Sequence, residues 1–148
     1  FVFLGPLLPG ARKFFRHFRD PRIRCLGAVS LQEKTDALAA CDLLCVPSVQ
    51  ESFGGVYTEA WSFAKPVIGC PIPAVAAVIA DQKDGILVNQ DPEAIAQGII
   101  RILRDPEWAR ELGRRGFEKV KSCYGWEQLA EKTLAAYQYA VLSAGHRM

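Results

Sequence analysis

The sequence lacks an apolar run long enough to span a bilayer, and it lacks the pattern of a signal peptide. We therefore expect a soluble, cytoplasmic protein. No two cysteines form a CxxC pair and there are only two histidines, which argues against a zinc site. The five cysteines are an odd number and mostly interrupt apolar runs, which predicts buried, reduced thiols. The chain also has little excess of one charge over the other, and a net charge of +2 does not indicate a nucleic-acid partner.

The chain has the size and composition of one globular domain. It has 148 residues, 50% hydrophobic and 23% charged, which excludes a disordered or fibrous protein. Short, continuously apolar runs alternate with helical patterns, as expected for a parallel sheet covered on both faces. The predicted strands are residues 1–4, 23–26, 43–46, 66–68 and 86–88.

Helix signals separate most of these strands and continue to the end of the chain. Ser30 and Glu33 form a predicted capping box, and Asp91 followed by Pro92 predicts another helix start. After the last strand only helices are expected. Their predicted ranges are 92–104, 106–123 with a break near Gly113, and 126–144. The fold class is therefore α/β with a helical C-terminal segment.

The stretch ESFGGVYTEAW, residues 51–61, follows the third predicted strand, at the sheet edge where parallel α/β folds bind ligands. Gly54 and Gly55 permit close approach of a ligand to the backbone, and the amides of the following helix favour a phosphate. Glu51 precedes that helix and Glu59 lies one to two turns along it. Two carboxylates around a phosphate cradle suit the two sets of hydroxyls in a nucleotide-sugar.

The spacing of the two glutamates does not by itself decide between function and structure. Two glutamates eight positions apart arise by chance in roughly half of chains with this glutamate content, so the motif alone has little weight. Glu59 could be a solvated helix residue, and Glu51 could be an acid favoured by the helix dipole. Both interpretations stay open on spacing alone.

With its surroundings, the stretch resembles the donor-binding segment of family 4 retaining glycosyltransferases, which have the GT-B fold. The matching residues are Glu51, Phe53-Gly54, Glu59-Ala60 and Pro66-Val67. The likeness continues in IRCLGAVS, LAACDLLCVPS, DGILV and YGWEQLAEKTLAAY, so it covers nearly the whole chain in order. It implies a Rossmann-like three-layer domain with a parallel sheet of about five strands, the C-terminal half of a GT-B fold.

The resemblance implies roles at the donor sugar for three residues. Glu51 would contact the sugar near the reacting carbon and act as the catalytic residue by stabilising positive charge there. The backbone amides of Phe53 and Gly54 would meet sugar hydroxyls. Family members retain anomeric configuration, and no second acid is implied near the reacting carbon, so the two-carboxylate scheme of glycosidases is not expected.

The resemblance also implies how the nucleotide is held. The amides of Gly55 and Val56 would meet the diphosphate, Glu59 would hold the ribose hydroxyls, and Val29 would border the base. We expect a UDP-, GDP- or ADP-sugar as substrate, with no cofactor and no metal.

Several positions depart from the family pattern. Ala64 stands where the family usually has glycine and Trp61 where methionine is common, which we interpret as packing changes. Ala76 and Ala77 stand where relatives often carry polar residues.

The sequence also opens without methionine, directly on a predicted buried strand. We expect that the domain's first strand and helix, and an N-terminal domain that binds the acceptor, belong to a longer protein. The fragment alone is then expected to be inactive.

The segment ARKFFRHFRDPRIR, residues 11–24, mixes basic and aromatic residues and has two interpretations. It could be an amphipathic helix whose phenylalanines face the sheet while its arginines face water. It could also be a patch for an anionic membrane or for nucleic acid, since basic residues mixed with aromatics suit both, so peripheral contact of the longer protein with a membrane stays open.

Three functional hypotheses follow. The first is the donor half of a retaining glycosyltransferase. The second is a non-catalytic nucleotide-binding or scaffolding domain with the same Rossmann-like fold. The third is a nucleotide-sugar epimerase of GT-B fold. Hydrolysis or epimerisation without an acceptor would distinguish the third hypothesis from the first.

Overall fold

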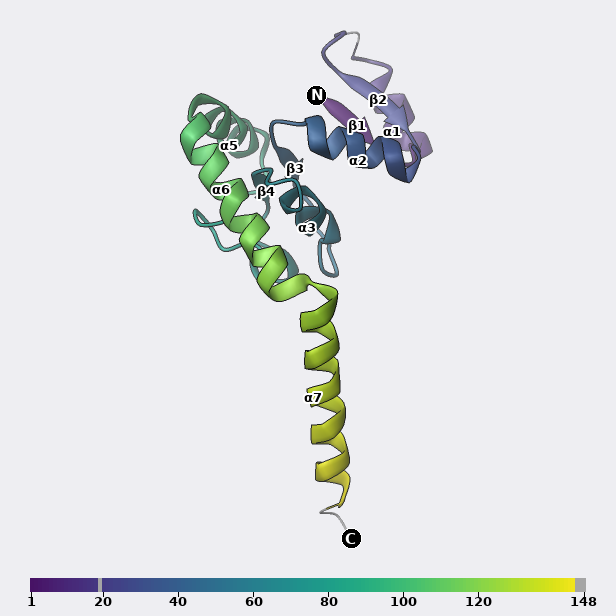
Figure 1. Ribbon diagram of the computed structural model, residues 1–148. Coiled ribbons are helices and arrows are strands. Elements are labelled where there is room, and N and C mark those ends of the chain that lie inside the picture. The colour runs from purple at the N-terminus through teal and green to yellow at the C-terminus, as the bar shows by residue number, and fades with distance from the viewer. Residues whose placement is uncertain (19, 146–148) are drawn as a thin grey trace. The chain divides into compact units, whose positions relative to one another are not determined.

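A computed structural model describes residues 1–18 and 20–145, which form two compact units (Figure 1). The first unit comprises Phe1–Ala40 and the second begins at Cys41. Each unit has its own parallel sheet, of two strands in the first and three in the second. All five predicted strands are confirmed, with every end placed to within one residue.

The first unit is a strand–helix–strand crossover followed by a further helix. Strands β1 (Val2–Leu4) and β2 (Arg24–Gly27) pair in parallel, and helix α1 (Pro9–Phe15) connects them. The amide of Gly5 donates a hydrogen bond of 2.8 Å to the carbonyl of Gly27, which holds together the loops that follow the two strands. The carboxyl ends of both strands therefore lie at one edge.

The aromatic residues of the basic segment only partly face this sheet. Phe15 packs against Phe3 of β1 with ring centroids 4.8 Å apart, but Phe14 and Phe18 are 59% and 47% exposed. The prediction that the phenylalanines face the sheet is confirmed for Phe15 and wrong for the other two. The helix has only seven residues, so Phe18 lies beyond its end, and Phe14 points about 100° away from Phe15.

Helix α2 (Leu31–Ala40) begins at the predicted capping box. The amide of Ser30 donates to the Glu33 carboxylate (2.8 Å), and the amide of Glu33 donates to the Ser30 hydroxyl (3.2 Å). The hydrogen bonds from Ser30 favour the ionised carboxylate and lower the pKa of Glu33. The start of this helix is thus fixed by local sequence.

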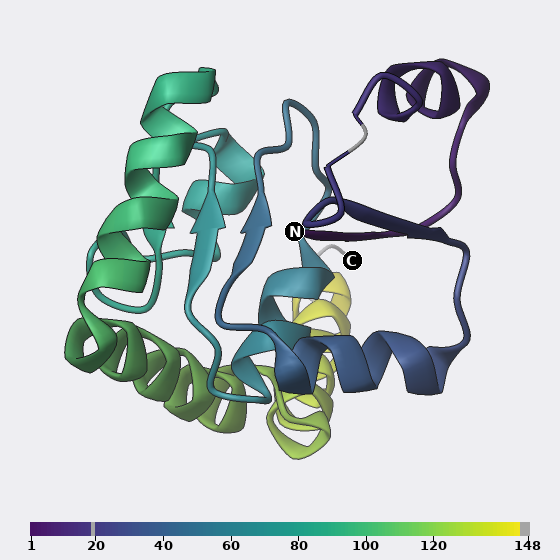
Figure 2. The same ribbon diagram turned by 90° about the horizontal axis from the view of Figure 1, so that it is seen from above.

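The second unit contains the larger sheet, in the order β3-β4-β5 (Figure 2). Strand β3 (Leu44–Val46) pairs in parallel with β4 (Val67–Gly69), and β4 pairs in parallel with β5 (Ile86–Leu87). Helix α3 (Gly55–Trp61) connects the first two strands, and the short helix α4 (Pro73–Ala76) precedes the third. Neighbouring strands are thus linked by helices, as a parallel sheet requires.

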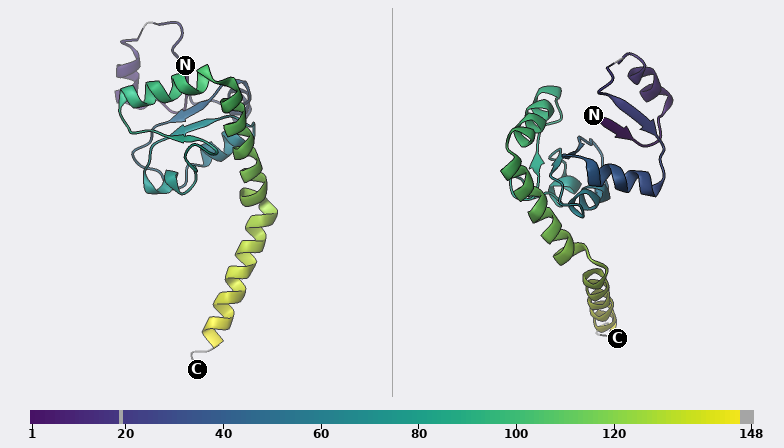
Figure 3. Two further views of the ribbon diagram at one scale, coloured as in Figure 1. Left: turned by 90° about the vertical axis from the view of Figure 1, so that its left-hand side faces the viewer. Right: turned by 45° about the horizontal axis from the view of Figure 1, so that its top comes forward.

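Helices cover both faces of this sheet, giving three layers (Figure 3). On one face, α5 (Pro92–Arg104) and α6 (Pro106–Lys119) enclose a buried aliphatic cluster. The cluster consists of Ile68, Ile86, Ile102 and Leu112. On the other face, a Cβ at Gly69 would lie 2.7 Å from Val75 and 2.9 Å from Ile79, so the segment around α4 packs directly on β4. The predicted three-layer α/β architecture is confirmed.

The predicted helix starting at Pro92 is confirmed in its bounds and in its cap, because the Asp91 carboxylate accepts from the amides of Glu93 (3.0 Å) and Ala94 (3.2 Å). The predicted break near Gly113 is wrong, since α6 runs through it without interruption. Gly113 lies against the backbone carbonyl of Ala64, and a side chain there would collide with it. This glycine therefore marks a close approach between segments rather than a helix break.

After α6 the helix widens into the π-helical turn η1 (Val120–Tyr124), and Gly125 separates it from α7 (Trp126–Gly145). Helix α7 matches the last predicted helix. The side chain of Trp126, the first residue of α7, is 88% exposed. Among the residues placed by the structure, no helix is both long and apolar enough to cross a membrane.

Ala64, one of the departures from the family pattern, has a left-handed backbone with φ of 52°. It follows helix α3, where its amide donates to the Trp61 carbonyl (2.8 Å) and that of Lys65 donates to Ala60 (3.1 Å). A residue at this point of a helix terminus is usually glycine, because the left-handed conformation crowds a Cβ. The consequence of alanine at this position is therefore strain in the backbone, and the predicted packing change is wrong.

Replacing Ala64 by glycine should stabilise the protein. A left-handed residue other than glycine costs about 1–2 kcal/mol, and glycine adds roughly 0.5–1 kcal/mol of entropy to the unfolded chain. The free energy of unfolding of the full-length protein should then rise by up to about 1 kcal/mol, measured by urea denaturation. Ala77→Gly is the matched control, since Ala77 is also exposed but has φ of −74°. Because no left-handed strain is relieved there, this change should lower the free energy of unfolding. Equal destabilisation by both changes would contradict a strained Ala64.

Candidate functional site

The candidate site is the loop between the end of β3 and the start of α3. Immediately after β3, the amide of Ser48 turns back to donate to the carbonyl of Val46 (2.9 Å). The side-chain amide of Gln90 donates to the carbonyl of Pro47 at 2.6 Å, so the segment after β5 supports this loop. The loop thus leaves the carboxyl end of a buried parallel strand, the edge at which such sheets bind ligands.

Gly54 ends this loop in a conformation that favours glycine. It caps α3 with φ of 79° and ψ of 46°, in the left-handed region. A Cβ at Gly54 would lie 2.6 Å from the ring of Tyr57 and 3.5 Å from Cγ of Glu51. Both backbone conformation and space exclude a side chain here. Glu51 therefore lies close to the turn that begins the helix.

Tyr57 is fully buried beneath this turn. Its hydroxyl donates to the carbonyl of Val46 (2.8 Å) and its amide donates to the carbonyl of Gly54 (2.9 Å). Burial raises the pKa of Tyr57 to about 12, and the nearby Glu51 carboxylate contributes in the same direction. The hydroxyl therefore stays protonated and acts as a donor.

The two predicted acidic residues lie on this single loop–helix junction. Glu51 is half-buried and its carboxylate accepts from the amide of Ser52 (3.0 Å). Glu59 lies on α3 and is half-buried as well. Phe53 is 45% exposed, with its ring edge-on to that of Tyr124 at 5.6 Å. The structure thus brings the predicted residues of the second unit together at the start of one helix.

Four successive backbone amides between the glutamates make no hydrogen bond to other protein groups within residues 1–18 and 20–145. They belong to Phe53, Gly54, Gly55 and Val56. Gly55 is exposed and Val56 is half-buried. Amides at a helix start carry partial positive charge, so this group can accept an anionic or hydroxyl-bearing ligand.

Val29, the predicted base contact, lies in the first unit. It lines a cavity of about 320 Å³ at the carboxyl ends of β1 and β2. The other residues of the cavity are Leu4, Gly5, Pro6, Ala28, Ser30, Leu31 and Lys34. Its size falls at the lower end of small-molecule sites.

Among the residues that the structure places, no three histidine, cysteine or acidic side chains gather as metal ligands would. The five cysteines are free thiols; Cys70 is buried and the other four are half-buried. The prediction of buried, reduced thiols is therefore confirmed in full only for Cys70, because the other four free thiols are only partly buried. Burial raises the pKa of Cys45 to about 11, which makes it a poor nucleophile.

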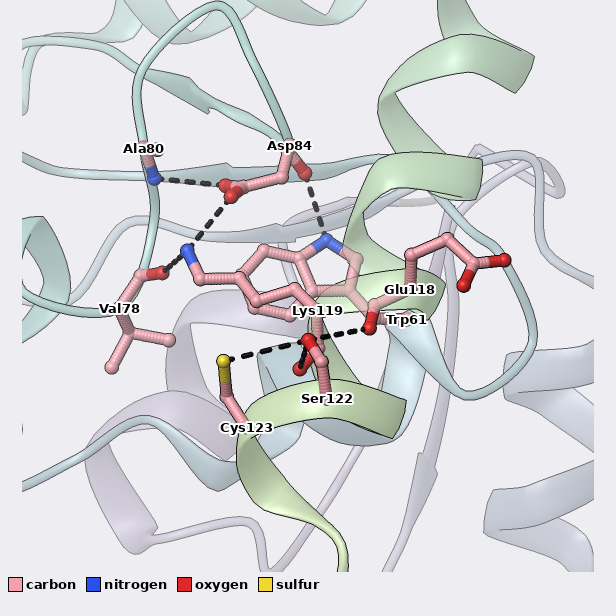
Figure 4. Close-up of polar contacts among 8 residues, drawn as sticks. All are labelled: Trp61, Val78, Ala80, Asp84, Glu118, Lys119, Ser122 and Cys123. Atoms are coloured by element: carbon pink, nitrogen blue, oxygen red, sulfur yellow. Dashed lines mark hydrogen bonds and ion pairs between the residues drawn. The ribbon is translucent and has the colours of Figure 1, made fainter. Parts of the chain in front are cut away.

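At the far end of α3, a buried ion pair fixes the helix against α6 (Figure 4). Lys119 donates to the Asp84 carboxylate (2.7 Å) and to the carbonyl of Val78 (2.5 Å), and it lies 5.2 Å from the centroid of the Trp61 ring. The other carboxylate oxygen of Asp84 accepts from the amide of Ala80 (2.8 Å). The indole of Trp61 donates to the backbone carbonyl of Asp84 (2.8 Å). We call Trp61, Asp84 and Lys119 the anchor.

Sequence reasoning missed both Tyr57 and the anchor. Trp61 was noted only as a departure from the family pattern, and Asp84 and Lys119 stand 35 positions apart with no local signal. One available signal was Gly116 on α6, because a side chain there would collide with the ring of Trp61. A large residue on one helix and a glycine on its neighbour are the expected pair for close helix packing.

Known proteins resemble this chain over most of its length. The protein-family profile for "Glycosyl transferases group 1" matches residues 1–105. The D-inositol 3-phosphate glycosyltransferase of a Nocardioides species is 31% identical over 121 residues, which are 81% of this chain. The solved sucrose-phosphate synthase of Thermosynechococcus elongatus has a TM-score of 0.84 and 27% identity over 96% of this chain. HepE of Anabaena, solved with UDP and glucose, has a TM-score of 0.76 and 18% identity over 94%, a likeness of fold.

The matched proteins are much longer than this chain. The matched region is 26% of the Nocardioides protein, 38% of the sucrose-phosphate synthase chain and 39% of the HepE chain.

Removing the cation of the anchor should destabilise the protein strongly. Loss of one partner from a buried ion pair costs roughly 3–5 kcal/mol, and the Lys119 side chain is 24% exposed, so we expect about 3 kcal/mol for Lys119→Met. The free energy of unfolding of the full-length protein, from urea denaturation, measures this. Arg115→Met breaks the exposed pair with Glu111 on the same helix and should cost about 0.5 kcal/mol or less. A similar loss in the free energy of unfolding for the two variants would show that the anchor is no stronger than a surface pair.

Proposed function

This chain belongs to the glycosyl transferases group 1 family, and we propose that it is the donor-binding half of an enzyme that transfers a sugar from a nucleotide-sugar. The transfer would proceed with retention of anomeric configuration. The loop–helix junction carries this proposal, because Glu51 and Glu59 flank four backbone amides that bond to no protein group in the part of the chain that the structure describes. An alternation of acidic and amide groups suits a ligand whose hydroxyls lie on both sides of a diphosphate.

The donor would lie along this junction. The amides of Gly55 and Val56 would hold the diphosphate, since the start of a helix favours negative charge. Glu59, further along α3, would accept hydrogen bonds from the ribose hydroxyls. The role of Val29 at the base stays a prediction; within the first unit, Val29 lines the cavity at the carboxyl ends of β1 and β2. A UDP-sugar, GDP-sugar or ADP-sugar would fit this scheme, and the fold shared with UDP-bound HepE supports a nucleoside diphosphate.

Catalysis would depend on charge stabilisation around the reacting carbon. As the sugar–phosphate bond breaks, positive charge develops on the sugar and negative charge on the leaving diphosphate. Glu51 would stabilise the sugar, while the amides of Phe53 and Gly54 would hold its hydroxyls. The helix amides would stabilise the diphosphate without a bound metal. Fixed dipoles of this kind act without reorganising during the reaction.

The acceptor would bind a domain that this chain does not contain. The shared region makes up only 26% of the Nocardioides protein and 38% of the sucrose-phosphate synthase chain, which leaves room for such a domain. We therefore propose that turnover needs the longer protein and that the 148 residues alone do not transfer sugar. We place the protein in the cytoplasm, since five free thiols suit a reducing compartment.

Loss of Glu59 should weaken donor binding. A hydrogen bond to a charged group contributes about 1.5–3 kcal/mol, so Glu59→Ala should raise the Kd for the donor ten- to hundredfold. Calorimetric titration of the full-length protein with UDP-, GDP- and ADP-glucose measures this. Glu107→Ala, in the exposed first turn of α6, is the control and should leave the Kd unchanged. An unaltered donor Kd in Glu59→Ala would remove the ribose role.

Loss of the Glu51 charge should impair turnover more than binding. Glu51→Gln keeps the size of the side chain but removes the charge that stabilises the reacting sugar. We expect kcat to fall by about 10²–10³, as on losing one electrostatic contact to a transition state, while the donor Kd changes less than fivefold. Steady-state transfer to acceptor and calorimetry together separate the two effects. Unchanged turnover would refute the catalytic assignment.

A further inference from the structure

Tyr57 closes the loop that carries Glu51 by bonding to both of its ends. The loop leaves β3 at Val46 and enters α3 through Gly54. The Tyr57 hydroxyl donates to the carbonyl of Val46 (2.8 Å), and the Tyr57 amide donates to the carbonyl of Gly54 (2.9 Å). One residue thus ties the strand end to the helix start on either side of Glu51.

The ring of Tyr57 also determines the shape of the turn. It fills the space that a side chain of residue 54 would occupy, at 2.6 Å from such a Cβ. The same added Cβ would meet Cγ of Glu51 at 3.5 Å, so the ring, the Gly54 turn and the Glu51 stem lie within contact distance of one point. The Tyr57 side chain is fully buried, so it does not itself reach solvent or an outside ligand.

A hydroxyl at this buried position needs a hydrogen-bond partner, since an unpaired buried hydroxyl is costly. A phenylalanine would fill the same volume and bury only apolar surface. The specific contribution of tyrosine is therefore the bond to Val46, which also accepts from the amide of Ser48 (2.9 Å). That bond restrains the strand end relative to the helix start and adds little to the filling of the core.

We propose that Tyr57 is a positioning residue that sets the place of Glu51 relative to the helix amides of the donor site. The inference rests on the proposed function, because it assumes that Glu51 acts on the donor sugar. Displacement of a reacting group by about 1 Å can cost a hundredfold in rate, whereas binding through other contacts is largely kept. Loss of the Tyr57 hydroxyl should therefore lower kcat and leave the donor KM nearly unchanged.

The test compares Tyr57→Phe with Thr58→Val in the full-length protein. Both residues lie on α3, and each change removes one hydroxyl that donates to a backbone carbonyl: that of Val46 in β3 for Tyr57, and that of Gly55 in α3 for Thr58 (2.8 Å). Transfer from the donor sugar gives kcat and KM. Hydrogen exchange of peptides covering residues 47–56 reports the loop directly, without need of activity. Thermal unfolding shows whether the whole fold is affected.

For Tyr57→Phe we expect kcat to fall about tenfold with a donor KM within twofold of wild type. Within residues 47–56, the hydrogen-bonded amides of Ser48 and Ser52 should exchange about two- to tenfold faster, the factor that one lost hydrogen bond produces. The melting temperature should drop by about 5 °C or less. Thr58→Val should match wild type in kcat, KM and loop exchange.

Three results would overturn the inference. The first is wild-type kcat and wild-type loop exchange in Tyr57→Phe. The second is a loss that extends to exchange throughout the protein, which would indicate a purely structural role. The third is an equal effect of Thr58→Val. If the wild-type protein neither binds nor turns over UDP-, GDP- or ADP-glucose, the proposed function fails, and the inference falls with it. Exchange of residues 47–56 would then still decide whether the hydroxyl holds the loop.

Discussion

The close approach of helix α6 to helix α3 is the constraint on which the second unit depends. Gly113 meets the backbone of Ala64, and Gly116 meets the ring of Trp61, so any larger residue at either position would push the helices apart. The contact brings Lys119 to Asp84 and the carbonyl of Val78. An ion pair taken out of water is costly unless its polar groups are satisfied, and here the Asp84 carboxylate and the carbonyl of Val78 both accept from Lys119.

The anchor and the candidate site lie at opposite ends of the strands. Asp84 lies two residues before β5, and Trp61 ends the helix that leads into β4, so both belong to the edge where strands begin. Glu51 and Gly54 follow β3, at the edge where strands end. Ligand sites of parallel sheets lie at the second edge. The loop can therefore vary with the substrate while the anchor maintains the position of the helix that carries it.

Local chemistry made much of the fold predictable. The strands were placed from continuous apolar runs, and the helix starts at Ser30 and Asp91 from side chains that cap their own helix. The candidate site was also local, because all its predicted residues in the second unit fall within Glu51 to Glu59. The features that were missed are those set by distant partners. Gly113 resembled a helix break until its contact with the backbone of Ala64 was known.

The loop at the site is restrained by aromatic side chains from two directions. Tyr57 lies beneath Gly54, inside the core, while Tyr124 meets the half-exposed ring of Phe53 from η1. Gly125, with extended backbone, follows η1 and separates it from the exposed helix α7. Since these restraints differ in burial, the outer part of the loop can adjust while its two ends at Val46 and Gly54 stay fixed.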